Sequence, residues 1–212
     1  AVDLCAYAVM SNHYHIVIRI DLEAAQNWSD QEVAQRWTQI FSGPDLVKRW
    51  LADKSLTVAE QAHVNALLVI WRERLRDISW FMRCLNESVA RMANREDQCT
   101  GRFWEGRFKS QALLDDRAIL SCMAYVDLNP VRAALASTPE NSDYTSIQER
   151  VLRPDSCTLS PMNGQNWESE GLPFSLNDYL EFVDWAGRGI RSGKRGAIAG
   201  NQPPILQRLQ MN

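Results

Sequence analysis

Two histidines separated by one residue, His13 and His15, open a segment of strictly alternating sequence. On a β-strand, residues two apart point to the same side and lie roughly 6–7 Å from each other, so both imidazoles can reach one divalent cation. Neutral imidazole binds many first-row metals, so the pair does not select one of them. The alternative is a half-buried sheet surface that carries two incidental histidines.

A tyrosine and an asparagine four residues apart, Tyr125 and Asn129, lie at the end of a segment, 117–128, with helical apolar spacing. Residues four apart share one face of a helix. Tyrosine can attack phosphorus and form a covalent phosphodiester, and an amide oxygen is a hard ligand that suits Mg²⁺. The alternative is a core tyrosine followed by an asparagine that ends the helix before Pro130.

Aromatic and basic residues interleave over residues 101–109, GRFWEGRFK. This composition suits single-stranded nucleic acid, because rings stack on bases while cations neutralise phosphates. Trp104 or Phe108 could instead anchor the loop to a core. The segment 187–195 has four cations and no acid, and it is either a phosphate-binding segment or a solvated end. The candidate nucleic-acid contacts in the two segments are Arg102, Trp104, Arg107, Lys109, Arg188, Arg191, Lys194 and Arg195.

The elements that must position these residues begin with a β-hairpin. Residues 4–10 and 13–20 have strand patterns and flank a Ser-Asn turn. Tyr14 and the isoleucines at every second position after it share one face, which we expect to pack on the core. The two histidines, Val17 and Arg19 share the other face.

Helical patterns occupy most of the remaining chain. Capping-box spacing at Ser29 and at Thr57 predicts two helix starts, and the second helical stretch is expected to break near 77–79. Further segments have less regular patterns. They are a short helix at 45–51, a helix at 82–93, a loop at 94–110 with a short strand over 107–113, a surface linker at 156–173 and a helix at 176–185.

Composition limits the class of protein. The 212 residues carry 23 basic and 26 acidic side chains, a net charge of −3, which argues against non-specific coating of nucleic acid. Five widely spaced cysteines without a CxxC pair argue against a disulfide framework or a structural zinc site, and they fit a reducing cytoplasm. No apolar run approaches the roughly 18 residues that a membrane span needs, so we expect no membrane partner.

Three blocks of sequence, taken together, resemble one family. They are AYAVMSNHYH at 6–15, GRFWEGRFKS at 101–110 and YVDLNPVRA at 125–133. These blocks resemble the REP-associated tyrosine transposases, which are single-tyrosine members of the HUH nuclease superfamily. The resemblance covers residues 4–20 and about 80–135, and it implies an α+β, ferredoxin-like (RRM-like) fold with an antiparallel sheet, enlarged by a helical insertion at 21–79.

The resemblance also implies a role for each motif residue. His13, His15 and Asn129 would be the metal ligands, Tyr125 the nucleophile, and Arg132 of the third block a further DNA contact. The implied activity is cleavage and rejoining of single-stranded DNA near hairpins with Mg²⁺ or Mn²⁺, through a 5′-phosphotyrosine and a free 3′-hydroxyl. The implied partner is single-stranded or hairpin DNA, and the protein would work as a monomer or homodimer.

Family members usually place a strand and a helix before the histidine hairpin, whereas this chain starts on the hairpin. We therefore expect the first βα unit to be missing, which would expose a sheet edge and weaken the floor under the histidines. The expected domains are an N-terminally incomplete catalytic domain, 1–150, and a C-terminal extension, 151–212, with a linker, a helix and a basic tail.

Two rival functions stay open. One is a domesticated, catalytically idle binder of structured single-stranded DNA. The other is a metal-binding α+β domain with no nucleic-acid role. Clustered arginines between residues 72 and 95 speak against the second, although helical arginines often form a solvated face.

Overall fold

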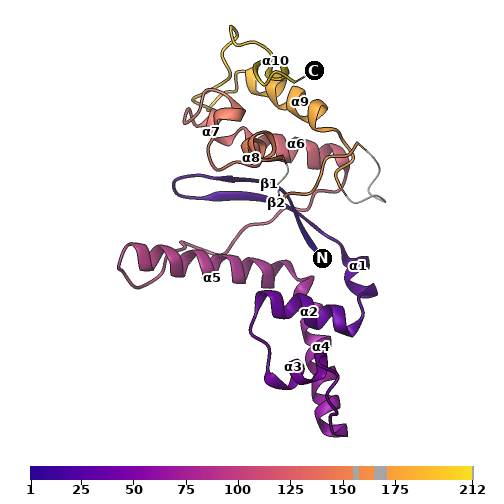
Figure 1. Ribbon diagram of the computed structural model, residues 1–212. Helices are drawn as coiled ribbons and strands as arrows, with labels where there is room; N and C mark the ends of the chain where they lie inside the picture. The colour runs from indigo at the N-terminus through magenta and orange to yellow at the C-terminus, as the bar shows by residue number, and fades with distance from the viewer. Residues whose placement is uncertain (155–157, 165–170, 212) are drawn as a thin grey trace. The chain divides into compact units, whose positions relative to one another are not determined.

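The computed structural model describes residues 1–154, 158–164 and 171–211, and its architecture is α+β (Figure 1). Helices and a two-stranded antiparallel sheet make up the regular structure of these residues, which confirms the expected class. The ferredoxin-like arrangement stays a prediction. The chain divides into two compact units, the first made of residues 1–2 and 20–110 and the second of residues 3–19 and 111–212. In the described part of the chain, no helix is long and apolar enough to cross a membrane.

The first unit is helical, and its helices begin where capping residues stand. Ser29 and Thr57 each form a capping box with a glutamate three residues later, as predicted. The Asp77 side chain accepts a hydrogen bond from the Ser79 backbone N at 2.6 Å and starts a new helix, which confirms the predicted break. The five helices are α1 (Leu22–Asn27), α2 (Asp30–Ile40), α3 (Asp45–Leu51), α4 (Val58–Leu75) and α5 (Ile78–Glu96).

The core of the first unit lies where α2, α3 and α4 meet. Trp37 of α2 and Trp71 of α4 stack with ring centroids 4.9 Å apart and planes 3° from parallel. Val64 and Leu68 of α4 are buried beside them. Burial of such large apolar side chains stabilises a fold by about 1.5–3 kcal/mol each, so this unit has its own source of stability.

The strand expected over residues 107–113 is not present in the structure. These residues are in neither a strand nor a helix. Their apolar side chains are used for packing instead, because Phe108 lines a pocket of the first unit and Leu113 packs on the core of the second. A run of alternating sequence forms a strand only where a partner strand is available, and none pairs with it among the described residues.

The second unit contains the predicted hairpin, β1 (Val2–Val9) and β2 (Tyr14–Ile20). The edge of β1 that faces away from β2 is covered. Val9 N donates to the Tyr144 carbonyl at 3.0 Å, Tyr7 N donates to Ser146 Oγ at 3.0 Å, and Ser160 N donates to the Leu4 carbonyl at 2.8 Å. No described strand other than β1 pairs with β2. The prediction of a missing first βα unit is not tested by these contacts.

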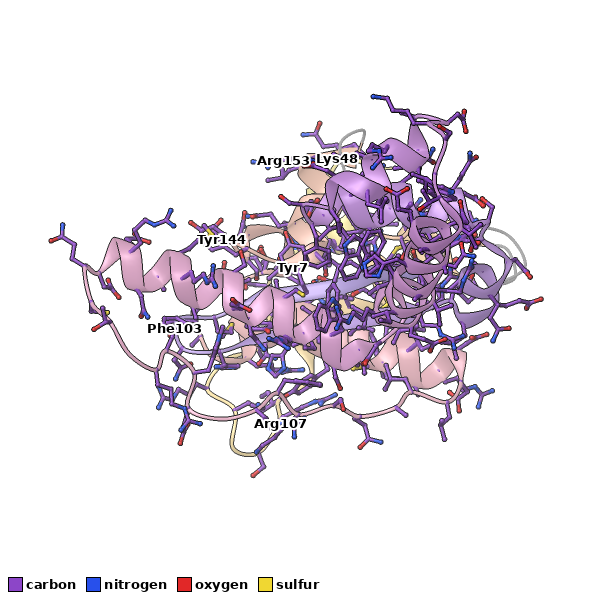
Figure 2. The ribbon with its side chains drawn as sticks, turned by 90° about the horizontal axis from the view of Figure 1, so that it is seen from below. Tyr7, Lys48, Phe103, Arg107, Tyr144 and Arg153 are labelled. Atoms are coloured by element: carbon purple, nitrogen blue, oxygen red, sulfur yellow. The ribbon has the colours of Figure 1, made fainter. Side chains whose placement is uncertain are left out.

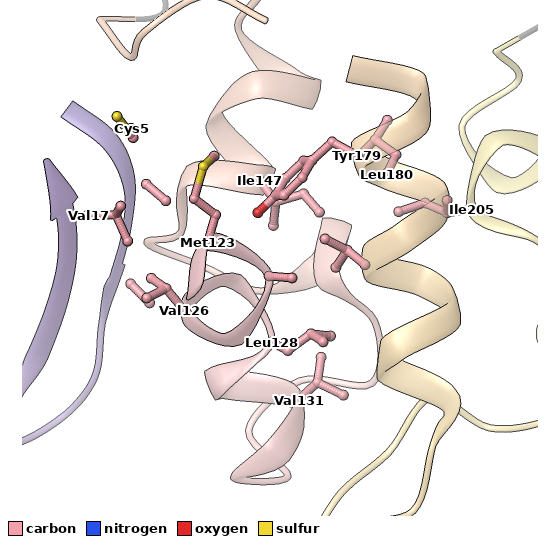
Figure 3. Close-up of a cluster of buried hydrophobic side chains, with 14 of the residues drawn as sticks. Cys5, Val17, Met123, Val126, Leu128, Val131, Ile147, Tyr179, Leu180 and Ile205 are labelled. Atoms are coloured by element: carbon pink, nitrogen blue, oxygen red, sulfur yellow. The ribbon is translucent and has the colours of Figure 1, made fainter. Parts of the chain in front are cut away.

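The hairpin packs on the core of the second unit through the face opposite to the one expected. Val17, which shares its face with the histidines, is only 5% exposed and belongs to the same apolar cluster as Met123 and Val126 (Figure 3). Ala6 and Ala8 of β1 are buried in the same cluster and are small enough to let a helix approach closely. Tyr14 and the isoleucines of β2 are only partly buried. The prediction that their wider apolar face packs on this core is therefore wrong.

Helices from the C-terminal half complete this core. Met123 and Val126 come from one helix, Ile147 from a second, and Tyr179 and Leu180 from a third (Figure 3). The predicted helices at 117–128 and 176–185 are confirmed, with the second one longer than expected. The helices are α6 (Asp116–Asp127), α7 (Asn129–Arg132), η1 (Pro139–Asn141), α8 (Ser146–Leu152), α9 (Leu176–Arg188) and α10 (Ile205–Arg208).

The predicted surface linker, 156–173, falls partly on residues 156–157 and 165–170, which lie outside the described residues. Its described part is not wholly on the surface, because Leu159 and Leu172 are buried. Met162 and Leu172 also form a β-bridge. The four cysteines that the structure describes are free thiols, as expected, and Cys157 is not among them.

Candidate active site

The turn of the hairpin and the start of β2 place the two histidines. Met10 N donates to the His13 carbonyl at 2.8 Å and closes the turn, and His13 Nδ1 lies 2.7 Å from Asn12 Oδ1. His13 is exposed, whereas His15 is half-buried on the face that packs on α6. The imidazole centroids are 5.0 Å apart and the rings are nearly perpendicular, at 85°. The two rings therefore lie side by side, as the sequence predicts.

The surroundings of His15 favour the neutral form of its imidazole. Burial lowers the pKa of His15, and repulsion from His13 and Lys194 lowers it further. A neutral ring keeps the lone pair that a metal ligand needs. Two imidazoles that bind one cation through nitrogens at about 2.1 Å have centroids roughly 5 Å apart. The observed separation fits a shared cation.

Tyr125 is the exposed residue in a buried stretch of α6. Its side chain is 43% exposed, whereas Ala124 and Val126 are each 3% exposed. The alternative of a core tyrosine is therefore wrong. The rings of Tyr125 and His15 have centroids 6.0 Å apart, and Lys194 Nζ lies 5.7 Å from the Tyr125 ring centroid. A phenol, two imidazoles and an ammonium group thus gather in one place.

Asn129 lies one helical turn after Tyr125, at the start of α7, and is 8% exposed. Its side-chain nitrogen Nδ2 is buried and has no hydrogen-bond partner among the described residues. An unpaired buried polar group costs about 1–3 kcal/mol, and rotating the amide by 180° exchanges its nitrogen for a ligand oxygen. The side-chain nitrogen of Asn129 therefore contributes no hydrogen bond to the fold among the described residues. No group of three or more His, Cys, Asp or Glu side chains in the described ranges could hold a metal ion.

Asp127 is a buried carboxylate that the sequence did not single out. Its Oδ1 accepts hydrogen bonds from Ser146 Oγ at 2.6 Å and Ile147 N at 3.0 Å, and its Oδ2 accepts one from Tyr179 Oη at 2.5 Å. Burial raises the pKa of Asp127 to about 6, although these hydrogen bonds and Arg150 oppose the shift. Asp127 joins α6, α8 and α9, so it fixes the helix that carries Tyr125. The sequence does contain a signal for this role of Asp127, because an acidic residue lies within the apolar stripe of a predicted helix.

No protein-family model, curated protein or solved structure matches the chain. The contacts within the second unit therefore carry the assignment of this site. These contacts bring together two histidines, a tyrosine and a lysine, namely His13, His15, Tyr125 and Lys194. In the sequence, β2 and α6 are separated by residues of the first unit. Asn129 is placed one turn away on the same helical segment.

The other predicted cations of the second unit fall into two groups. The Arg132 guanidinium is buried, and it donates to the carbonyls of Ala186 and Gly189, both at 2.6 Å. Arg188 pairs with Asp184 at 2.8 Å and also donates to two carbonyls. These two side chains hold the end of α9 in place. Their neighbours Arg191 and Arg195 are exposed, as is Lys194.

The predicted contacts of the 101–109 loop lie in the first unit. Trp104 Nε1 donates to the Asn86 carbonyl of α5 at 2.9 Å, so Trp104 anchors the loop, as the alternative proposed. Arg102 Nε donates to the Trp104 carbonyl at 2.8 Å. Phe103 and Arg107 lie on the segment that returns along α5 (Figure 2), and Arg107 lines a pocket of about 420 Å³ with Trp80. Lys109 is exposed beyond this pocket.

The arginines of α4 and α5 contact groups of their own unit. Arg76 pairs with Glu73 at 2.6 Å and Arg91 pairs with Glu87 at 2.5 Å. The guanidinium of Arg74 stands 4.1 Å from the Trp80 ring centroid, and that of Arg83 stands 5.2 Å from it. Exposed ion pairs of this kind contribute little stability.

Proposed function

We propose that the second unit is a metal-dependent endonuclease and strand-transferase for single-stranded DNA, with Tyr125 as the nucleophile. The observation that carries this proposal is the 6.0 Å approach of the His15 and Tyr125 rings. A partly exposed phenol beside two imidazoles and a cation suits attack on a phosphodiester, because nucleophile, ligands and countercharge are within one site. The resemblance of the three sequence blocks to the tyrosine transposases agrees with this chemistry.

His13, His15 and Asn129 would hold the divalent cation, Mg²⁺ or Mn²⁺. When bound, such an ion polarises the scissile phosphate and neutralises charge that develops on it. A set of two imidazoles and one amide is neutral, so the ion keeps its full positive charge for the phosphate. Lys194, near the Tyr125 ring, adds a second positive charge at the same place.

In the proposed reaction, Tyr125 Oη attacks phosphorus and loses its proton, and a phosphorus–oxygen bond forms. The bond from phosphorus to the 3′-oxygen of the preceding nucleotide breaks, and that oxygen takes up a proton to leave as a 3′-hydroxyl. The product is a 5′-phosphotyrosine. Attack by another 3′-hydroxyl reverses the step, so the same site cuts and joins strands. Hairpin DNA would be held by the exposed cations at 191–195.

Tyr125→Phe tests the nucleophile. The full chain is incubated with labelled single-stranded hairpin DNA and Mn²⁺ and is then run on a denaturing gel. We expect a shifted, protease-sensitive protein–DNA band that Tyr125→Phe and EDTA each abolish. Tyr144→Phe is the matched control, because Tyr144 is 74% exposed in the same unit and belongs to no predicted motif. It should leave the band unchanged.

A folded protein that binds the hairpin but never forms the band would favour the rival function, a catalytically idle DNA binder. In that case Tyr125→Phe should bind as tightly as the unmodified protein. A band that survives Tyr125→Phe would show that another residue forms the adduct, and the assignment of Tyr125 would fail.

A further inference from the structure

A cavity of about 650 Å³ opens beside Tyr125, between α6 and α9. Tyr125 and Ala124 of α6 form one side, and Phe182 and Trp185 of α9 form the other. The segment that follows α9 closes a third side, with Ile190. The volume falls within the ~300–1,000 Å³ that small-molecule sites occupy. The proposed function uses Tyr125, Arg191 and Lys194 of this cavity but leaves its apolar side chains on α9 without a role.

The residues that line the cavity include four basic side chains and no acidic one, counted over the described residues. Arg132 and Arg188 are engaged with carbonyls and with Asp184. Arg191 and Lys194 are exposed at its rim. A concave site with this charge balance favours an anionic ligand.

The cavity also exposes large apolar side chains. Trp185 is 73% exposed and Ile190 is 93% exposed, although burial would favour both. The Trp185 ring stacks on Phe182, with centroids 6.3 Å apart and planes 25° from parallel, so it is supported from behind. An exposed, supported aromatic ring beside cations suits a flat aromatic group that carries a phosphate.

We propose that this cavity binds the base of a nucleotide next to the phosphate that Tyr125 attacks, with the base stacked on Trp185 and its backbone phosphate against Arg191 and Lys194. This inference rests on the proposed function for the position of the strand. It adds a binding role for α9 and identifies Trp185 as the residue that holds a base. The site would therefore distinguish DNA strands by the base next to the cleaved phosphate.

Binding without metal tests this site independently of cleavage. Fluorescence anisotropy in EDTA compares a labelled oligothymidylate of about 12 nucleotides with an abasic strand that has the same phosphates. We expect the unmodified protein to bind the base-containing strand about 5- to 100-fold more tightly than the abasic one. Trp185→Ala should remove most of this preference, and Trp185→Phe should restore part of it. Tyr144→Ala, at another exposed aromatic residue of the unit, should not change it.

Equal affinity of the unmodified protein for the two strands would overturn the base-binding site, and so would a preference that Trp185→Ala leaves intact. In either case, a covalent band that depends on Tyr125 would leave the proposed function standing. Conversely, a preference that depends on Trp185, found together with no covalent band, would support the base site while the nuclease fails. Near-ultraviolet circular dichroism of each variant confirms that the unit is folded.

Discussion

At the scale of single residues, Tyr125 stands out because it is exposed where the residues before and after it are buried. A tyrosine that served only to fill the core would point with Met123 and Val126 toward the hairpin. Tyr125 instead lies between the histidine face of β2 and the cavity beside α9. Its phenol is therefore placed to meet a ligand from solvent.

The pKa of His15 provides a prediction at this scale. Proton NMR titration should show His15 titrating below the ordinary value of 6.5, since burial and the repulsion from His13 and Lys194 disfavour its charged form. His13→Ala should raise the pKa of His15 only in part, because burial is the largest cause and remains. A His15 resonance that titrates at or above 6.5 would contradict this account.

Residue types and spacing were enough to predict the local pairs of this site. His13 with His15, and Tyr125 with Asn129, are close because strand and helix geometry places residues two or four apart on one side. The proximity of Lys194 to Tyr125 and of Tyr179 to Asp127 depends on how α6 and α9 pack. No local pattern encodes contacts between residues more than fifty positions apart.

At the scale of elements, α6, α8 and α9 are held together by polar groups as well as by apolar packing. Asp127 accepts hydrogen bonds from α8 and α9, and Arg132 donates to the carbonyls at the end of α9. Carbonyls at a helix C-terminus lack partners within the helix, and a cation is favourable there. The helix that carries Tyr125 is thus fixed against the helix that carries Trp185.

Asp127 gives this packing a dependence on pH. The folded-state pKa of about 6 is higher than the ordinary value of 3.8, so the folded state binds the proton more tightly than the unfolded state. The resulting stability is fully present below pH 3.8 and is lost as pH rises through 6. It amounts to about 3 kcal/mol for a shift of this size.

Asp127→Asn removes the ionisable group while keeping its shape. Urea unfolding between pH 4 and pH 7 should show that the variant gains stability relative to the unmodified protein as pH rises. The difference between the two proteins isolates Asp127 from groups such as His15, whose lowered pKa acts in the opposite direction. Parallel curves would show that Asp127 has an ordinary pKa in the folded state.

Elements with a strong start signal were predictable. Of the elements without one, α3 was predicted and others were missed. The capping boxes at Ser29 and Thr57 each mark a helix that the structure contains. The short helix α8 was missed because its seven residues follow a single capping threonine and show little periodicity. The face of the hairpin that packs on the core was mispredicted because that choice depends on α6.

At the scale of the whole molecule, the described residues form two separate apolar cores, one in each unit. Trp37, Trp71 and Leu68 belong to the first, and Met123, Ile147 and Leu180 belong to the second. A unit with its own core unfolds as its own cooperative body when few interactions bind it to the rest. The length of the chain alone cannot show where a second core forms.

Core variants should therefore act locally. Trp71→Ala should destabilise the first unit by about 3–5 kcal/mol, and Leu180→Ala should destabilise the second by about 2–5 kcal/mol. Hydrogen exchange measured by mass spectrometry should show Trp71→Ala reducing protection in α2 to α4 and sparing α6 and α9, with the reverse for Leu180→Ala. Loss of protection in both units from either variant would indicate one cooperative body.

The division of the second unit into residues 3–19 and 111–212 has a consequence during translation. The hairpin leaves the ribosome before its partners in α6, α8 and α9, which are made only after residues 20–110 of the first unit. At ordinary elongation rates this delay is roughly 5 to 20 seconds, and an isolated two-stranded hairpin is barely stable in water. The first unit can fold before the helices that pack on the hairpin have been synthesised. The contact between His15 and Tyr125 can then form only after residues 20–110 of the first unit have been made.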